Sequence, residues 1–146
     1  GVGRLRGYEH AMQAAGLPVN PEYVLLGDFR TESGYRLAKQ LMCMSDPPTA
    51  IIGGNNLMTM GIFRCLKDMD VPVPDQVSLI GFDDFQLAGY LSPPLTVVDR
   101  PMSDMGRLAA DLLFSRIEKR DVGPVRRVVL PTALEVRGSC RRLNDR

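Results

Sequence analysis

The chain has 146 residues, of which 45% are hydrophobic and 24% charged, and its formal net charge is +1. This composition is typical of one ordinary soluble domain that can bury a core without a disulfide or a structural metal. No apolar run approaches the roughly 18 residues of a membrane-spanning helix, no apolar signal segment occurs in residues 1–10, and the near-neutral charge argues against a nucleic-acid-binding surface spread over the whole chain.

The basic residues, the cysteines and the single histidine further limit the kinds of site that the chain could hold. From Arg116 onward nine Arg and Lys stand against four acids, which indicates a solvated basic tail or, alternatively, a patch for a polyanion. The three cysteines form no C-x-x-C pair, so we expect reduced thiols in a cytoplasmic protein. His10 has no Cys or His partners nearby and is expected on a helix surface, so we predict no metal site there.

Helical and strand-like patterns alternate along the chain. In order, they predict a helix over 5–15, a buried strand over 23–26, a helix capped by Thr31 or Ser33 and ending near 44, a strand over 50–52, a helix over 57–70, strands over 77–81 and 95–98, a helix capped by Ser103 and ending near Lys119, and an extended segment over 128–136. Pro131 lacks an N–H and directs the extended segment to a sheet edge.

Short apolar strands separated by amphipathic helices indicate an α/β fold: a doubly wound, mostly parallel sheet with helices on both faces. Ligands bind such sheets outside the carboxyl ends of the strands. The polar and aromatic residues at those ends are Asp28, Phe29, residues 53–56, Phe82, Asp83, Asp84, Asp99 and Arg100.

These strand-end residues suit the binding of a small polar molecule, because carboxylates and amides pair with hydroxyls or ring nitrogens and a ring stacks on an apolar face. The adjacent acids Asp83 and Asp84 leave three interpretations open: loop capping, ligand binding, or a magnesium site for phosphoryl transfer. The phosphate loop G-x-x-x-x-G-K-[ST] that would favour phosphoryl transfer does not occur in the sequence.

Two helices have unusual apolar faces. The helix over 57–69 is apolar on two sides, so either another layer of this chain or a partner subunit must cover its second side, and our hypothesis is a homodimer interface. The helix that follows Ser103 has one apolar stripe but no strand left for it to cover.

Several stretches resemble, in order and spacing, the effector-binding domain of the lactose and galactose repressor family (LacI/GalR) of bacterial transcription regulators. They are GRLRGY at 3–8, GDF at 27–29 with SGY at 33–35, PTA at 48–50 with NNLMTMG at 55–61, VPVP at 71–74 with VSLIGFDD at 77–84, and PPLT at 93–96. The resemblance covers nearly the whole chain.

The resemblance implies a fold like that of class I periplasmic binding proteins, in which two α/β halves close on an effector. At the family's positions Arg4 would contact the effector, Phe29 would stack on it, and Asn55 and Asp83 would bind its polar groups. A homodimer is implied, and its interface would contain Leu57, Met58, Gly61, Phe63, Tyr90 and Leu91.

Compared with members of that family, the chain is expected to be an incomplete effector-binding domain. Residues 1–98 would form the C-terminal subdomain, the helix over 101–120 would belong with an N-terminal subdomain outside this chain, 125–138 would be a final extended segment, and 139–146 a tail. DNA would be bound only through a helix-turn-helix domain outside this chain, and effector binding by this chain alone would be weak or absent.

The implied function is effector sensing and dimerisation in a cytoplasmic, DNA-binding transcription regulator, with no enzymatic activity and no cofactor. The effector would be a sugar, a sugar derivative or a nucleobase. One alternative is a periplasmic-type solute-binding protein for a sugar, and a second is a metal-dependent phosphoryl-transfer enzyme that uses Asp83 and Asp84.

Overall fold

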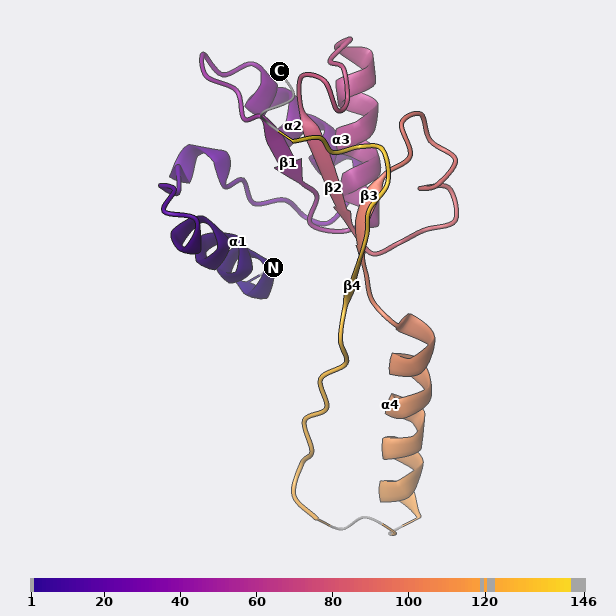
Figure 1. Ribbon diagram of the computed structural model, residues 1–146. Coiled ribbons are helices and arrows are strands. Elements are labelled where there is room, and N and C mark those ends of the chain that lie inside the picture. The colour runs from indigo at the N-terminus through magenta and orange to yellow at the C-terminus, as the bar shows by residue number, and fades with distance from the viewer. Residues whose placement is uncertain (1, 119, 121–122, 143–146) are drawn as a thin grey trace.

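The computed structural model describes residues 2–118, 120 and 123–142 (Figure 1). The elements in chain order are α1 (Val2–Ala14), the 3-10 turn η1 (Pro21–Tyr23), α2 (Thr31–Met42), β1 (Ala50–Ile52), α3 (Asn56–Asp68), β2 (Ser78–Phe82), β3 (Thr96–Asp99), α4 (Met102–Ile117) and β4 (Ala133–Glu135). Four helices and three of the strands therefore lie where the periodicity predicts them.

The strands form one sheet in the order β1-β2-β3-β4. The pairs β1–β2 and β2–β3 are parallel, whereas β4 runs antiparallel to β3 at the edge. This edge position confirms the role predicted for the segment that contains Pro131, which lies just before β4. The predicted α/β class with a mostly parallel sheet is confirmed.

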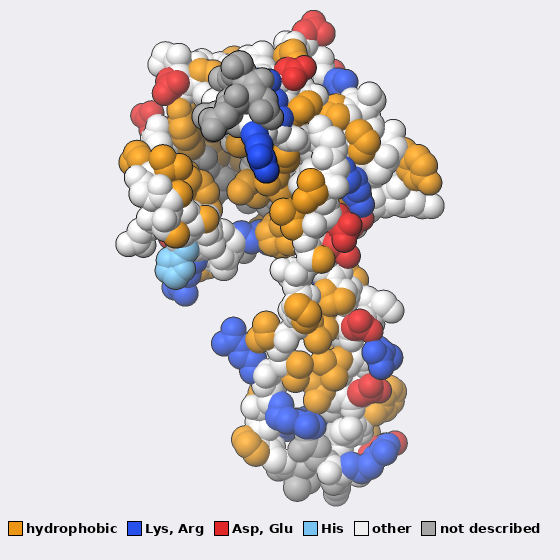
Figure 2. Space-filling model, in the orientation of Figure 1, with side chains coloured by type: hydrophobic (Ala, Val, Ile, Leu, Met, Phe, Trp, Pro, Cys, Tyr) orange, Lys and Arg blue, Asp and Glu red, His pale blue; other side chains and the backbone are white. Residues whose placement is uncertain are grey.

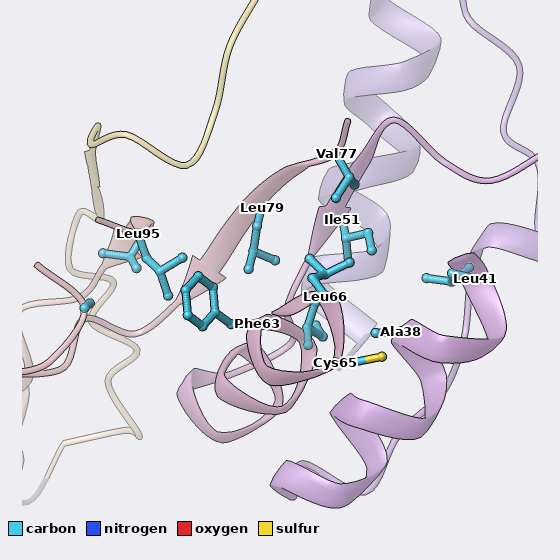
Figure 3. Packing of buried hydrophobic residues seen from close by; sticks show 12 residues of the cluster. Ala38, Leu41, Ile51, Phe63, Cys65, Leu66, Val77, Leu79 and Leu95 are labelled. Atoms are coloured by element: carbon cyan, nitrogen blue, oxygen red, sulfur yellow. The ribbon is translucent and has the colours of Figure 1, made fainter. Parts of the chain in front are cut away.

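The core lies between one face of the sheet and the helices α2 and α3 (Figure 3). Leu66 of α3 and Leu79 of β2 are completely buried in it, and Ala38 of α2 is 1% exposed. Successive strand side chains point to opposite faces, and on the other face Ile52 is 54% exposed. In the described part of the chain, the packed core therefore lies on one face of the sheet.

Helix α3 is covered on both of its apolar sides by this chain. Figure 3 shows Phe63 and Leu66 directed toward the sheet, while Cys65 lies beside Ala38 of α2. Of the two explanations for its two-sided apolar pattern, a second layer of the same chain is the one observed, so the pattern alone gives no argument for a dimer.

Residues 23–26 do not form the predicted strand. The side chain of Asn20 accepts a hydrogen bond from the N–H of Glu22 and starts the turn η1, after which the chain runs without a strand partner. Leu26 is 86% exposed. The apolar run was therefore wrongly interpreted, because hydrophobicity does not specify a hydrogen-bonding partner.

The predicted helix caps were also wrong. Helix α2 has Arg30 at its N-cap position without a side-chain cap, and the Ser33 hydroxyl instead accepts from the N–H of Asp28 and donates to the carbonyl of Arg30. Helix α4 has Pro101, not Ser103, at its N-cap position. In both helices the serine or threonine lies inside the first turn.

Helix α4 stands away from the sheet, and the chain returns from it in an extended conformation (Figure 1). We call the described residues between 101 and 132 the α4 arm, and β1–β4 with α2 and α3 the sheet lobe. None of the helix residues is buried, and Figure 2 shows apolar side chains along the arm. An uncovered apolar stripe was predicted and is confirmed, while the predicted end of this helix at Lys119 lies outside the described residues.

The final segment is partly built into the sheet lobe. Ser139 is completely buried: its hydroxyl donates to the carbonyl of Leu79 at 2.6 Å and accepts from the N–H of Thr96 at 2.8 Å. Residues 139–142 were expected to belong to a tail, yet Ser139 packs into the sheet lobe. Residues 143–146 of that tail lie outside the described residues.

The remaining predictions concern single residues. Cys43 is exposed, Cys65 buried and Cys140 half-buried, and all three are free thiols. His10 lies exposed on α1. None of the described helices is long and apolar enough to cross a membrane.

Candidate functional site

The candidate site lies where β1, β2 and β3 end, because the carboxyl ends of parallel strands share one edge of the sheet. Asn55 is the N-cap of α3 and connects two of the loops there. Its side-chain oxygen accepts from the N–H of Met58 at 2.9 Å, and its amide nitrogen donates to the carbonyl of Phe29 at 3.0 Å. One N–H of the amide remains for a ligand.

The backbone carbonyl of Phe29 already accepts the hydrogen bond from Asn55, and the residue is 44% exposed. Its ring is therefore the part of the residue that a ligand can contact. Beside it, Asp28 accepts from the N–H of Arg30 at 3.0 Å. Hydrogen bonding to Ser33, and then to this N–H, lowers the pKa of the Asp28 carboxyl, which is therefore charged near neutral pH.

Asp83 directly follows β2 and is bound from two sides. Its N–H donates to the carbonyl of Val98, and its carboxylate accepts from Nε of Arg100 at 2.5 Å. The side chains of Asp83 and Arg100 are 18% and 29% exposed. The carboxylate thus lies at a partly open edge of the sheet, where a ligand that donates hydrogen bonds can reach it.

Arg4 reaches this edge from α1. Its guanidinium lies 4.2 Å from the centre of the Phe82 ring, which is a cation–π distance. Its Nε is buried and has no hydrogen-bond partner among the described residues. The strand-end rule could not find Arg4, because Arg4 lies on a helix; only the family resemblance indicated it.

Backbone strain coincides with this site. Phe29 and Asp83 have φ angles of 64° and 68°, in the left-handed region that residues with a side chain rarely occupy. Such conformations cost on the order of 1–3 kcal/mol each and cluster at functional sites. A third case, Asp70 at 53°, lies just after the C-cap of α3, a common place for this conformation.

Asp84 does not share a site with Asp83. Its two oxygens accept from Nη1 and Nη2 of Arg137 at 3.0 and 2.6 Å, and Oδ1 also accepts from the N–H of Phe85. The hydrogen bond from Arg137 lowers the pKa of the Asp84 carboxyl. Each acid therefore faces its own arginine, and within the described ranges no group of three or more His, Cys, Asp or Glu is placed to hold a metal ion.

The residues expected at a dimer interface fall into two groups. Met58, Gly61 and Phe63 are buried within the sheet lobe, whereas Leu57 and Tyr90 are 50% and 84% exposed and Leu91 is half-buried. A Cβ at Gly61 would overlap the carbonyl oxygen of Thr31, so this glycine allows α2 and α3 to approach closely.

Sequence reasoning missed the partners of the two acids. Arg100 was noted only as a strand-end residue, and Arg137 lies 53 positions from Asp84 with no local pattern joining them. Only the return of β4 to the sheet brings Arg137 there.

Comparison with known proteins finds relatives of this chain and a family model that matches it. A family model described as "Periplasmic binding protein-like domain" matches residues 1–140. The "HTH-type transcriptional repressor PurR" of Photobacterium profundum is 39% identical over 142 residues, 97% of this chain and 42% of the relative. The "Ribose operon repressor" of Escherichia coli is 36% identical over 136 residues, 93% of this chain and 41% of the relative.

Solved structures show the same fold. The "transcriptional regulator CelR-cellobiose complex" superposes with a TM-score of 0.89 at 37% identity, over 94% of this chain and 42% of that one. A LacI family regulator of Enterococcus faecium with bound ribose gives 0.84 at 26% identity, over 94% of this chain and 50% of that one.

The chain spans about two fifths of the length of the curated relatives it matches. Those relatives are named as repressors rather than enzymes, and the predicted resemblance is confirmed. The chain belongs to the family of periplasmic binding protein-like domains, in the form found in LacI-family transcription regulators.

Proposed function

We propose that this chain is part of the effector-sensing and dimerisation domain of a bacterial transcription regulator. One observation carries the proposal: Phe29 and Asp83, two strained residues, lie at the carboxyl edge of the sheet with the N-cap Asn55. That edge is where α/β sheets bind ligands. The repressor names of the relatives support a regulator, operating in the cytoplasm, over a solute-binding protein.

Four side chains would contact the ligand, each in a different way. The exposed ring of Phe29 covers an apolar face of the ligand, and the carboxylate of Asp83 accepts from its hydroxyls or ring N–H groups. Asn55 donates its free amide N–H, and Arg4, which stacks on Phe82, supplies a cationic donor. This set fits a small ligand with one apolar face and several polar groups, such as a sugar, a sugar derivative or a nucleobase.

Binding would act by population shift. A ligand that binds one closure state better changes the population of that state and so the spacing of two DNA-binding heads in a homodimer. DNA would contact a helix-turn-helix domain outside this chain. In the dimer, Leu57 and Tyr90 are the exposed members of the expected interface, and Leu91 is half-buried.

The test is calorimetric titration of the complete gene product with ribose, cellobiose, sucrose and purine bases. One of these is expected to bind, and Phe29→Ala and Asp83→Asn should each weaken it at least about tenfold, which corresponds to roughly 1.4 kcal/mol. Glu32→Gln, which removes an exposed carboxylate on α2, is the matched control and should leave binding unchanged.

Two results would contradict the proposal. One is full affinity in both Phe29→Ala and Asp83→Asn, and the other is a complete gene product that binds none of these ligands and no promoter DNA. The 146-residue chain alone should bind the same ligand weakly or not at all, since a second subdomain would form the rest of the cleft.

A further inference from the structure

Two chain segments join the sheet lobe to the α4 arm, one leaving β3 and one entering β4. Arg100 comes directly after β3 and Arg137 lies two residues past the end of β4, and each arginine binds one of two adjacent acids. The outgoing segment leaves β3 after Asp99, and the returning segment enters β4 at Ala133. The two segments pair antiparallel, with Asp99 opposite Ala133. Any change in the angle between lobe and arm must bend the chain at this place (Figure 1).

The outgoing segment is held by a single side-chain contact. Arg100, the first residue after β3, donates from Nε to Oδ1 of Asp83 at 2.5 Å. No other side-chain hydrogen bond of Arg100 occurs within the described part of the chain.

The returning segment is held much more firmly. Arg137 donates from Nη1 and Nη2 to both oxygens of Asp84, and from Nη1 to the carbonyl of Leu95 at 2.9 Å. Its backbone N–H donates to the Thr96 hydroxyl at 3.0 Å. Two residues later, the buried Ser139 fixes the segment to β2 and β3.

We propose that the Asp83–Asp84 turn is a two-point anchor for the hinge. Asp84, through Arg137, holds the chain beyond β4 and so makes β4 the fixed point, whereas Asp83 holds the outgoing segment through Arg100 in a contact that a ligand can replace. This rests on the proposed function, in which the Asp83 carboxylate also binds the effector. Ligand hydroxyls that occupy this carboxylate would compete with Arg100 and so couple occupation of the site to the angle of the arm.

The first test measures that angle without ligand. In the complete gene product, spin labels at Cys43 on the α2 side and at Asp111→Cys on α4, with Cys140→Ser and any other reactive cysteine replaced, report the lobe-to-arm distance by double electron–electron resonance. Arg100→Gln should shift the distance distribution and Arg137→Gln should broaden it. Arg64→Gln, which breaks the exposed Glu32–Arg64 pair between α2 and α3, is the control and should leave it unchanged.

Two further variants separate the anchor from a general loss of folding. Asp84→Asn should broaden the distribution, though no more than Arg137→Gln does, because Arg137 also bonds to the carbonyl of Leu95. The double variant should match Arg137→Gln, since that change already removes the contact with Asp84. Arg137→Lys keeps the charge but not the bidentate geometry and should give an intermediate width. Wild-type distances in both Arg100→Gln and Arg137→Gln would overturn the proposal.

The second test uses a sugar. Where the unmodified protein binds ribose or cellobiose, Arg100→Gln should bind that sugar severalfold more tightly, since the sugar no longer displaces Arg100. Unchanged or weaker binding would overturn the competition. If the unmodified protein binds neither sugar nor any other ligand of the panel, the proposed function fails instead, and the distance measurements still decide the anchor.

Discussion

The sheet lobe and the α4 arm each contain a helix with apolar side chains, but only the helix of the lobe buries them. In α3 of the lobe, Leu66 is 0% and Phe63 is 8% exposed; in α4 of the arm, Leu113 is 58% and Phe114 is 56% exposed. The difference shows that an apolar stripe specifies that a helix face needs a cover, without specifying what the cover is. The arm carries the pattern of a packed helix, and its cover is not among the described residues.

The largest expected effect is on core packing. Leu66→Ala should destabilise the chain by about 2–5 kcal/mol, because it leaves a cavity between α3 and the sheet, whereas Leu113→Ala should stay within about 0.5 kcal/mol. Urea unfolding followed by circular dichroism measures both. Equal losses would mean that the arm packs in solution as tightly as the lobe.

The two regions should respond oppositely to the same change at glycine. Gly61→Ala should lower the free energy of unfolding by about 1–3 kcal/mol. The added Cβ would overlap backbone atoms of α2, so the two helices could no longer pack as closely. Gly106→Ala in α4 meets no atom within 4 Å and should stabilise the chain by about 0.5–1 kcal/mol through its higher helix propensity. Thermal melting of the two variants checks the signs, and a neutral Gly61→Ala would contradict the close approach of α2 and α3.

The return of the chain from the arm depends on Ser139. Ser139→Ala should cost about 1–3 kcal/mol, because it leaves the N–H of Thr96 without its buried acceptor and removes the donor to Leu79. Ser103→Ala, at an exposed position of α4, is the control and should stay within about 0.5 kcal/mol. Chemical denaturation gives both values. If the two serines cost the same, the buried segment is not a structural part of the lobe.

Much of the fold follows from the sequence because it depends on local periodicity. The helices α1–α4 and the strands β1–β3 were predicted, and the uncovered stripe of α4 could be recognised from the shortage of strands. Residues 23–26 were wrongly predicted because a strand requires a neighbour, which an apolar run does not supply. The cover of α3 by α2 is likewise a property of packing, not of either helix alone.

The candidate site divides in the same way. Asn55 and Asp83 were found by the strand-end rule, whereas Arg4 required the family resemblance. The rule also indicated Phe29, but after a strand that does not form; the hydrogen bond from Asn55 is what places Phe29 at the site. Arg137 could not be predicted, because its contact with Asp84 exists only after β4 has paired with β3. Long-range ion pairs leave no spacing in the sequence.

The smallest expected effect concerns two ion pairs, one in each region. Hydrogen bonding from Arg137 lowers the pKa of Asp84 below its ordinary 3.8, so the folded state favours the charged carboxylate. The stabilisation is therefore fully present above about pH 4 to 5 and is lost as the pH falls through the lowered pKa. Because both side chains are partly exposed, it should amount to at most about 1 kcal/mol at neutral pH.

The comparison is between Asp84→Asn and Asp104→Asn. The first removes the pair with Arg137, and its loss of stability relative to the unmodified chain should shrink between pH 5 and pH 3, a range of about two units. The second removes the more exposed Asp104–Arg107 pair of α4 and should cost less at every pH, since solvent screens it on all sides. Urea midpoints across this range measure both. A constant difference for Asp84→Asn would show that its carboxylate contributes no charge-dependent contact, and would contradict the proposal that Asp84 is the fixed point of the hinge anchor.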